Sequence, residues 1–457
     1  MRQVVGMKVG IGLRDIWPER IRLRSIVSLS LPIMGGMMSQ NLLNLADTAM
    51  VGRLGASELA AVGMGGVATF LAFAFLLGLS PAVQAMAARR LGEGRRADVA
   101  QPLNAGLMMA LLVGVPLGAM LYLVSDRAFA LLSDDPAVVT AGIPYLKLRM
   151  LSVAGVGINF SFRGYWNGVH RPSRYMITLA SMNLINILLN YIFIFGHAGC
   201  PAMGAAGAGL ASTVATYCGS LLYLFIGLGQ SRRQGFLKAL PARTAVGTLA
   251  RLALASGVQT AFYAAGATML FWIAGRIGTA ELAAANVIIN LVLVGVLPAM
   301  GMGLAAASLV GKSLGRGDDD DAYRWGWEVA AVAAIALSIP AGLLVMRPGL
   351  WLGLFTSASE VLAVGRVPLQ LSGAGLPLEA VALVLMNALM GAGDNTRVMR
   401  WSIICQWVFF LPLAYLVGPW LGGGLTGVWT VQLFYRFVTA VVFASLWMRG
   451  RWRKAVV

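Results

Sequence analysis

The sequence predicts an all-α integral membrane protein made of two homologous halves of about six transmembrane helices each. Hydrophobic residues occupy 58% of the 457 positions and charged residues only 12%, whereas soluble domains average about 25% charged residues. Apolar stretches long enough to cross a bilayer recur along the chain, and a motif of the first half returns in the second. Lipid offers the backbone no hydrogen bonds, and these stretches are too long and too uniform for barrel strands, so we expect helices.

The duplication has a constant offset along the chain. The run VGRLGASELAA at 51–61 returns as AGRIGTAELAA at 274–284, and LGEG at 91–94 returns as LGRG at 314–317, at the same offset. Two residues related by this offset, such as Arg53 and Arg276, are called repeat partners below. A repeat of half-chain length in a hydrophobic sequence indicates two homologous membrane lobes, which is a common construction of alternating-access transporters.

A window of about 20 residues finds twelve apolar stretches, six in each half. They predict an N-terminal lobe over 26–230 and a C-terminal lobe over 247–448, joined by a cytoplasmic linker over 231–246 and flanked by basic cytoplasmic segments at 1–25 and 449–457. The predicted spans are centred, in chain order, near Met37, Ala68, Ala110, Val153, Ile187, Ser220, Ala261, Ile289, Ile335, Leu378, Phe410 and Ala440.

The net charge of +17 follows the predicted topology. Basic residues concentrate at both termini and in the connections after the even-numbered spans. By the positive-inside rule, both termini are then cytoplasmic, the span count is even, and the protein is a multi-pass protein of the cell inner (plasma) membrane. The positive charge thus reflects orientation in the membrane, and we expect no nucleic-acid partner. The odd-numbered connections hold only Arg53, Arg127, Arg276, Arg347 and Arg366.

Several kinds of site are not indicated by the sequence. The three cysteines are scattered without C-x-x-C spacing, and two histidines are too few for a histidine metal cluster. No phosphate-binding loop of an ATP-driven pump and no constellation of catalytic residues is present. We therefore expect no metal, no cofactor and no enzymatic activity, and a non-transporting membrane enzyme is only a remote alternative.

Polar residues inside the first and fifth spans form two helical stripes. Asp47 is the most informative, because a carboxylate within a bilayer costs about 2.5 to 3.5 kcal/mol unless it is protonated, paired or hydrated. The asparagines serve equally well as hydrogen-bonding contacts between helices or as part of a site. The stripes consist of Gln40, Asn44 and Asp47 at i, i+4, i+7, and of Asn183, Asn186 and Asn190 at i, i+3, i+7.

Glu379 in the tenth span is the second acid within a predicted span, and Asn286 and Asn290 in the eighth span are candidate polar neighbours. It is either a protonated, hydrogen-bonded packing element or a group that binds substrate or an ion. Arg436 in the twelfth span either snorkels or lines a cavity. Pro32, about four turns before Asp47, is a candidate hinge.

These residues resemble the multidrug and toxic compound extrusion (MATE) transporters. The resemblance rests on the run LADTAMVGRLGASELAAVG at 45–63, its echo in the second half, the LGEG and LGRG loops, and the pattern around Arg163 and Gly391. It implies the MATE fold, in which two six-helix lobes are related by a pseudo-twofold axis along the membrane normal. It also implies export of organic cations against inward flow of protons or sodium.

Within the family, the chain combines features of two branches. Asp47, Pro32 and the asparagine stripe resemble the DinF-like branch, in which the first-span aspartate is the proposed cation-coupling residue. That branch usually has an aspartate where Asn190 stands. Glu379 resembles the tenth-span acid of the NorM-like branch, whereas Tyr263 stands where that branch has a seventh-span glutamate.

The resulting hypothesis is a proton-coupled antiporter that exports organic cations and drugs by alternating access. Asp47 would carry the proton, with Gln40, Asn44, Asn183, Asn186 and Asn190 around it. Substrate would contact Glu379, Asn286, Asn290 and Tyr263 between the lobes of a monomer embedded in the lipid bilayer. The alternatives are a sodium-coupled exporter of the same family and a flippase for lipid-linked substrates.

Overall fold

The computed structural model describes residues 17–455, which are almost entirely helical. Most of the expected basic segment at 1–25 and the last two residues of the tail at 449–457 lie outside the described residues. The helices of the first half are α1 (Arg20–Gly52), α2 (Ala56–Leu77), α3 (Leu79–Gly92), α4 (Gln101–Ala130), α5 (Pro136–Met150), α6 (Val153–Gly168), α7 (Pro172–Phe195) and α8 (Ala205–Gln230). Those of the second half are α9 (Arg243–Ile277), α10 (Thr279–Gly315), α11 (Asp319–Met346), α12 (Pro348–Gly353), α13 (Ser359–Gly391), α14 (Asn395–Ile403), α15 (Leu411–Tyr415) and α16 (Gly424–Met448).

The predicted spans are confirmed as helical segments. Ten segments of the described chain are long and apolar enough to cross a membrane, and the pair α5 and α6 adds an eleventh. The 35-residue helix α9 lies among them as the twelfth. Each predicted centre from Met37 to Ala440 falls within its own span. The eleventh span is the least regular, because π-helical turns at Ile404–Phe410 and Leu416–Trp420 interrupt it.

Two spans of the first half are broken where their counterparts are continuous. α2 and α3 meet at Gly78, and α5 and α6 enclose an angle of 51°. The corresponding helices of the second half, α10 and α13, are unbroken over 37 and 33 residues. The duplication therefore fixes the order and length of the spans but not their local bending.

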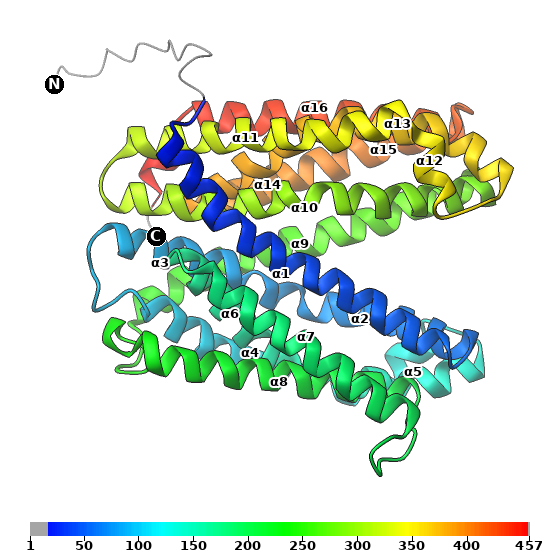
Figure 1. Ribbon diagram of the computed structural model, residues 1–457, viewed down its shortest axis with the longest axis horizontal. Coiled ribbons are helices and arrows are strands. Elements are labelled where there is room, and N and C mark those ends of the chain that lie inside the picture. Colours follow the sequence, from blue (N-terminus) through cyan, green and yellow to red (C-terminus); the bar gives the residue numbers. More distant parts are fainter. Residues whose placement is uncertain (1–16, 456–457) are drawn as a thin grey trace.

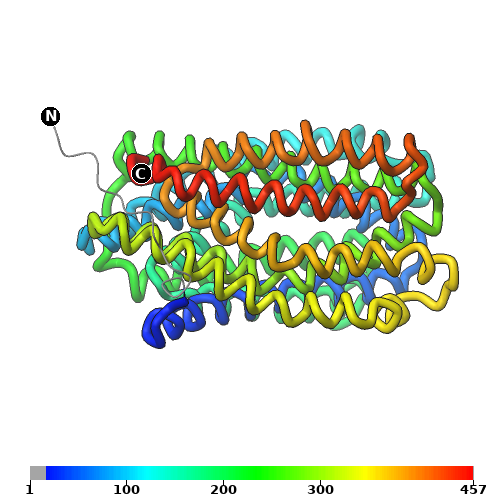
Figure 2. Tube along the Cα trace, turned by 90° about the horizontal axis from the view of Figure 1, so that it is seen from above, coloured from blue at the N-terminus to red at the C-terminus, as the bar shows by residue number. Residues whose placement is uncertain are grey.

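The helices form two bundles that run along a common long axis (Figures 1 and 2). Figure 1 shows most of the first half in the lower bundle and most of the second half in the upper bundle, with α1 crossing diagonally between them. α1 begins and α16 ends at the same end of the molecule (Figure 2). This arrangement agrees with an even number of spans.

Reciprocal contacts between the halves show the pseudo-twofold symmetry directly. A Cβ atom on Gly78 would lie 2.1 Å from the Ala253 carbonyl oxygen, and one on Gly301 would lie 3.4 Å from the Ser30 carbonyl oxygen. Gly301 is the repeat partner of Gly78, and Ala253 is the repeat partner of Ser30. The same pair of contacts made in both directions is what a twofold relation requires.

Polar contacts join the lobes at the end where α1 begins. Gln84 of α3 donates to the Leu304 carbonyl oxygen at 2.6 Å and to Ser308 Oγ at 2.9 Å. The half-buried His170 faces the Ser308 carbonyl oxygen at 3.4 Å. Burial and the nearby positive charge of Lys312 lower the pKa of His170 to about 4, so the ring is neutral at this interface.

An ionic cluster ties the start of α1 to the start of α11. The Arg22 guanidinium donates to Asp321 Oδ1 at 2.6 Å and to Glu328 Oε2 at 2.5 Å, and it stacks over the Trp325 ring at 3.6 Å. Glu328 is only 7% exposed at its side chain. The cluster links the lobes at this end, and loss of one partner alone would leave an uncompensated charge at a partly buried place.

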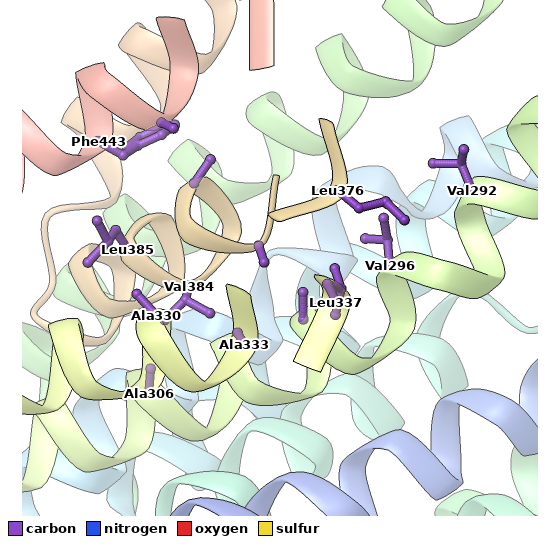
Figure 3. Close-up of a cluster of buried hydrophobic side chains, with 14 of the residues drawn as sticks. Val292, Val296, Ala306, Ala330, Ala333, Leu337, Leu376, Val384, Leu385 and Phe443 are labelled. Atoms are coloured by element: carbon purple, nitrogen blue, oxygen red, sulfur yellow. The ribbon is translucent and has the colours of Figure 1, made fainter. Parts of the chain in front are cut away.

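The core of the second lobe is aliphatic and well filled, as Figure 3 shows. Val296 of α10, Leu337 of α11 and Leu376 of α13 lie close together in it, and Val384 of α13 lies beside Ala330 of α11. Such packing makes the lobe a rigid support for the polar groups placed on it.

Candidate functional site

The structure brings Asp47 of α1 together with the asparagine stripe of α7. Asn190 Nδ2 donates to Asp47 Oδ1 at 2.6 Å, and it also contacts Asn186 Oδ1 at 2.9 Å. In the alternative orientation of the Asn186 amide, its nitrogen replaces this Oδ1 and donates to Asp47 Oδ1 across 3.2 Å instead of accepting from Asn190. Because Asp47 and the asparagine stripe lie on facing sides of α1 and α7, residues 143 positions apart in sequence meet in one polar cluster.

The other members of the α7 stripe have separate partners. Asn183 donates to Ser39 Oγ of α1 at 2.9 Å, and Asn186 contacts Ser212 Oγ of α8 at 3.1 Å. All three asparagines of the stripe are buried. Ser39 and Ser212 were not predicted, because a single serine in an apolar span carries no distinguishing signal.

Two acceptor atoms in this region lack partners. Asn183 Oδ1 and Asn190 Oδ1 are buried and have no hydrogen-bond partner among the described residues. Unsatisfied buried acceptors cost free energy, and native proteins usually supply them with a proton donor, a water molecule or an ion. Asn190 Oδ1 is therefore a free acceptor in the same polar cluster as Asp47.

Gln40 and Asn44, the remaining members of the α1 stripe, are bonded to each other. Gln40 Nε2 donates to Asn44 Oδ1 at 3.4 Å, and Asn44 is exposed. Pro32 lies inside α1, which continues as one helix from Arg20 to Gly52. The helix thus carries the Arg22 cluster near its beginning, Pro32 in its first half and Asp47 near its end.

Basic and aromatic groups surround the site on the side of α5. Arg149 lies close enough to attract Asp47 electrostatically and contacts the buried Tyr145. Its guanidinium also lies over the Phe73 ring at 5.5 Å. In the sequence, the signal for Arg149 is that an arginine lies close to a predicted span.

The second acid, Glu379 of α13, is bound by an arginine from another helix. Arg436 Nε of α16 lies 3.0 Å from Glu379 Oε2, and Arg436 Nη1 donates to the Ser372 carbonyl oxygen at 2.8 Å. The Arg436 side chain is 6% exposed and that of Glu379 is 23% exposed. The acid that the sequence left as either a protonated packing group or a binding group therefore has a charged partner, Arg436, which sequence reasoning did not pair with it.

The other predicted contacts of the second lobe are arranged around this pair only in part. Tyr263 of α9 is 64% exposed and lies close enough to interact electrostatically with Glu379 and Arg436. Asn290 of α10 instead donates to Asn286 Oδ1 at 2.8 Å, and both asparagines are exposed.

Neither acid has an acidic counterpart in the other half of the duplicated fold. The repeat partner of Asp47 is Leu270, and the repeat partner of Glu379 is Val156. Both counterparts are buried apolar side chains. Each lobe therefore carries its acid at a position where the other lobe has a buried apolar residue, so the two acids are not related by the duplication.

A separate cavity of about 490 Å³ opens in the first lobe. It is lined by Glu58, Pro136, Ala137, Thr140, Ala141, Pro144, Met203, Ala205 and Ala206, none of which belongs to the predicted site. The Glu58 carboxylate accepts a hydrogen bond from the Ala205 backbone N–H at 2.7 Å, at the beginning of α8. Within residues 17–455, no group of three or more His, Cys, Asp or Glu side chains gathers as metal ligands would.

Solved structures share the whole fold. One entitled "Outward-facing conformation of a multidrug resistance MATE family transporter of the MOP superfamily" superposes with a TM-score of 0.87, at 22% identity, over 98% of this chain and 100% of that one. Another, "Crystal structure of MATE in complex with MaL6", gives the same TM-score, identity and coverage.

Relatives of similar length are also found among bacterial proteins. "Probable multidrug resistance protein NorM" of Mannheimia succiniciproducens is 26% identical over 437 residues, which are 93% of this chain and 94% of that protein. "Multidrug resistance protein MdtK" of Yersinia pseudotuberculosis is 26% identical over 87% of this chain and 88% of its own.

The family model MatE matches twice, at residues 32–192 and 255–416, and the starts of the two matches are related by the offset of the duplication. The two matches coincide with the two halves of the chain and cover five spans of each lobe. With twelve helical spans in two pseudo-symmetric lobes, the chain belongs to the MatE family, whose members are membrane transporters and not enzymes.

Proposed function

We propose that this protein is a proton-coupled antiporter that exports organic cations and drugs across the cell inner membrane by alternating access. The observation that carries the proposal is the hydrogen bond between Asp47 and the fully buried Asn190. The names of the relatives, which are multidrug resistance proteins, support export of drug-like small molecules.

Asp47 has the properties needed of a proton carrier. Its surroundings on α7 and α8 are amides and hydroxyls that do not titrate, so it is the group at this site that can gain and lose a proton. The apolar lobe disfavours the charged carboxylate, whereas the positive charge of Arg149 and the hydrogen bond donated by the Asn190 amide stabilise it. Such opposing effects allow a carboxyl group to change protonation during a transport cycle.

An acceptor atom without a partner is available to the protonated form of Asp47. When Asp47 is protonated, its O–H becomes a donor, and the unpartnered Asn190 Oδ1 is an acceptor in the same cluster. A bound sodium ion would use the same oxygens, which keeps the sodium-coupled exporter as the nearest alternative. The proton is favoured because a second carboxylate, which would strengthen a sodium site, is replaced by Asn190.

The opposite lobe would hold the organic cation. Glu379 offers a partly exposed carboxylate, Tyr263 offers an exposed aromatic face, and Asn286 and Asn290 offer exposed amides. Cations with flat apolar bodies bind well to such a combination of carboxylate and aromatic groups. A flippase for lipid-linked pyrophosphates would need excess positive charge there, whereas the charge of Arg436 is balanced by Glu379.

α1 would couple the two events. It is anchored on the second lobe by Arg22 and holds Asp47 beyond Pro32. A change of charge at Asp47 would alter its bonds to α7, and the missing backbone hydrogen bond at Pro32 makes that point of α1 the easiest to bend. The described state, with the lobes in contact at the end carrying the basic loops, would be the outward-facing one.

The decisive experiment uses proteoliposomes with separately imposed proton and sodium gradients and several fluorescent organic cations. A pH gradient alone should drive transport, and a sodium gradient at equal pH should not. Transport driven only by a sodium gradient would show that the coupling ion is sodium and not the proton. If neither gradient drives transport of any of the cations, the exporter assignment fails.

A further inference from the structure

We infer that Arg436 is a specificity-determining residue that makes the carboxylate of Glu379 select organic cations carrying an N–H donor over quaternary ammonium ions. The inference rests on the proposed role of Glu379 in substrate binding. It goes beyond that role because it names the chemical class of cation and the residue that imposes the choice.

The geometry makes Glu379 and Arg436 a fixed neutral pair. Arg436 Nε reaches Glu379 Oε2 at 3.0 Å, and its Nη1 is held by the Ser372 carbonyl oxygen at 2.8 Å. A Cβ atom on Gly375, one turn before Glu379, would lie 2.8 Å from Arg436 Cδ, so the guanidinium lies tightly against α13. With its side chain only 6% exposed, Arg436 is not free to swing away from the carboxylate.

A neutral pair attracts ligands differently from an isolated carboxylate. The attraction of a distant cation to Glu379 is largely cancelled by its repulsion from Arg436, because both charges lie within about 3 Å of each other. A quaternary ammonium ion, which has no N–H group, depends on this cancelled attraction. A protonated amine additionally donates a directional, charge-assisted hydrogen bond to the exposed part of the carboxylate.

Exposure of the two partners supports this difference. Glu379 is 23% exposed, so part of its carboxylate is open to a ligand, whereas Arg436 is shielded and cannot itself be contacted to the same extent. Tyr263, which is exposed beside the pair, offers its ring equally to both kinds of cation. The preference must therefore come from the carboxylate and its bound arginine.

The test compares equilibrium binding of a fluorescent tertiary amine and its N-methylated quaternary analogue to purified full-length protein at about pH 8, where both carry one positive charge. The wild type should bind the amine more tightly. Arg436→Gln, which frees the carboxylate, should tighten binding of the quaternary ion by about fivefold or more and thereby reduce the preference. Arg436→Lys should keep most of the preference, and Thr430→Ala, at an exposed position of the same helix whose hydroxyl bonds only the Thr426 carbonyl oxygen, is the matched control.

A double variant keeps the test valid if Arg436→Gln does not fold. Glu379→Gln with Arg436→Gln leaves no buried charge. It should bind the quaternary ion within about twofold of wild type, because the wild-type ion pair has no net charge to attract that ion. It should lose the preference for the amine, because the carboxylate that accepts the amine's hydrogen bond is gone. A large loss of quaternary binding in the double variant, or an unchanged preference in folded Arg436→Gln, would overturn the inference.

These outcomes are separable from failure of the proposed function. If Glu379→Gln alone changes the affinity for neither ligand, Glu379 is not in the substrate site and the proposed substrate contact fails. If Glu379→Gln weakens amine binding while Arg436→Gln leaves the preference intact, the substrate contact stands and only the role of Arg436 is wrong. Binding in detergent needs no ion gradient, so the result does not depend on Asp47.

Discussion

Gly92 and Gly315, which are repeat partners, each pack against the helix that ends in the other. A Cβ atom on Gly92 would lie 2.0 Å from the Lys312 carbonyl oxygen, and one on Gly315 would lie 2.0 Å from the Arg89 carbonyl oxygen. Lys312 is itself the repeat partner of Arg89. The first glycine of each of the LGEG and LGRG motifs thus allows a close backbone approach between the lobes.

Gly92→Ala should therefore weaken the contact between the lobes at the basic end. The neighbouring atoms belong to the backbone and cannot rotate away, and overpacking of this kind costs about 1 to 3 kcal/mol. Pairs of spin labels on cysteines replacing Arg96 and Asp318, in a chain without its native cysteines, should show a larger fraction of long distances. Gly63→Ala, where nothing lies within 4 Å of the added carbon, is the control and should leave the distances unchanged.

Asp47→Asn should abolish gradient-driven export while the protein remains folded. The amide preserves the shape and accepts the hydrogen bond of Asn190 but cannot carry a proton. Transport into proteoliposomes and thermal stability in detergent check the two parts of this prediction. Full export by the variant would remove Asp47 from the mechanism.

Asn190→Asp should increase the sodium dependence of transport. The change places a second carboxylate next to Asp47 Oδ1, now 2.6 Å from the amide, and a pair of carboxylates binds a cation more strongly than one. The readout is transport at equal pH with and without a sodium gradient. Unchanged ion dependence would show that Asn190 does not decide the choice of ion.

Glu379→Gln should weaken export of monovalent organic cations and spare neutral or zwitterionic compounds. The substitution removes the carboxylate and leaves the buried Arg436 without its counter-charge, so a cation is repelled where it was previously accommodated. Export of the three classes should be measured side by side, with protein amount and stability matched. Equal export of all classes would leave Asp47 as the only functional acid.

The orientation in the membrane is tested by cysteine labelling of intact cells. Because the basic connections alternate along the chain, cysteines introduced at positions 95, 174, 243, 319 and 397 of a chain without its native cysteines should all face the cytoplasm and escape an impermeant reagent. A cysteine at the exposed Asp134, between α4 and α5, should be labelled. Strong external labelling at any of the five positions contradicts the orientation.

The sequence alone determined the architecture, because the information for it is local. Span positions follow from runs of apolar residues that must form their hydrogen bonds within one helix. The duplication follows from a motif repeated at a constant offset, as in 51–61 and 274–284. Asp47 was identifiable as a candidate in the same way, because the cost of a carboxylate within a membrane span is a property of that residue and its own helix.

Only the tertiary structure decided which polar groups meet. The bond of Asp47 to Asn190 joins α1 to α7, and the ion pair of Glu379 with Arg436 joins α13 to α16. Such pairs depend on how helices are rotated and placed against one another, and neither hydropathy nor the repeat determines this rotation. The repeat in fact has apolar residues, Leu270 and Val156, at the counterparts of both acids. The chain thus encodes locally both its twofold fold and the position of each acid, whereas long-range packing decides which side chains those acids meet.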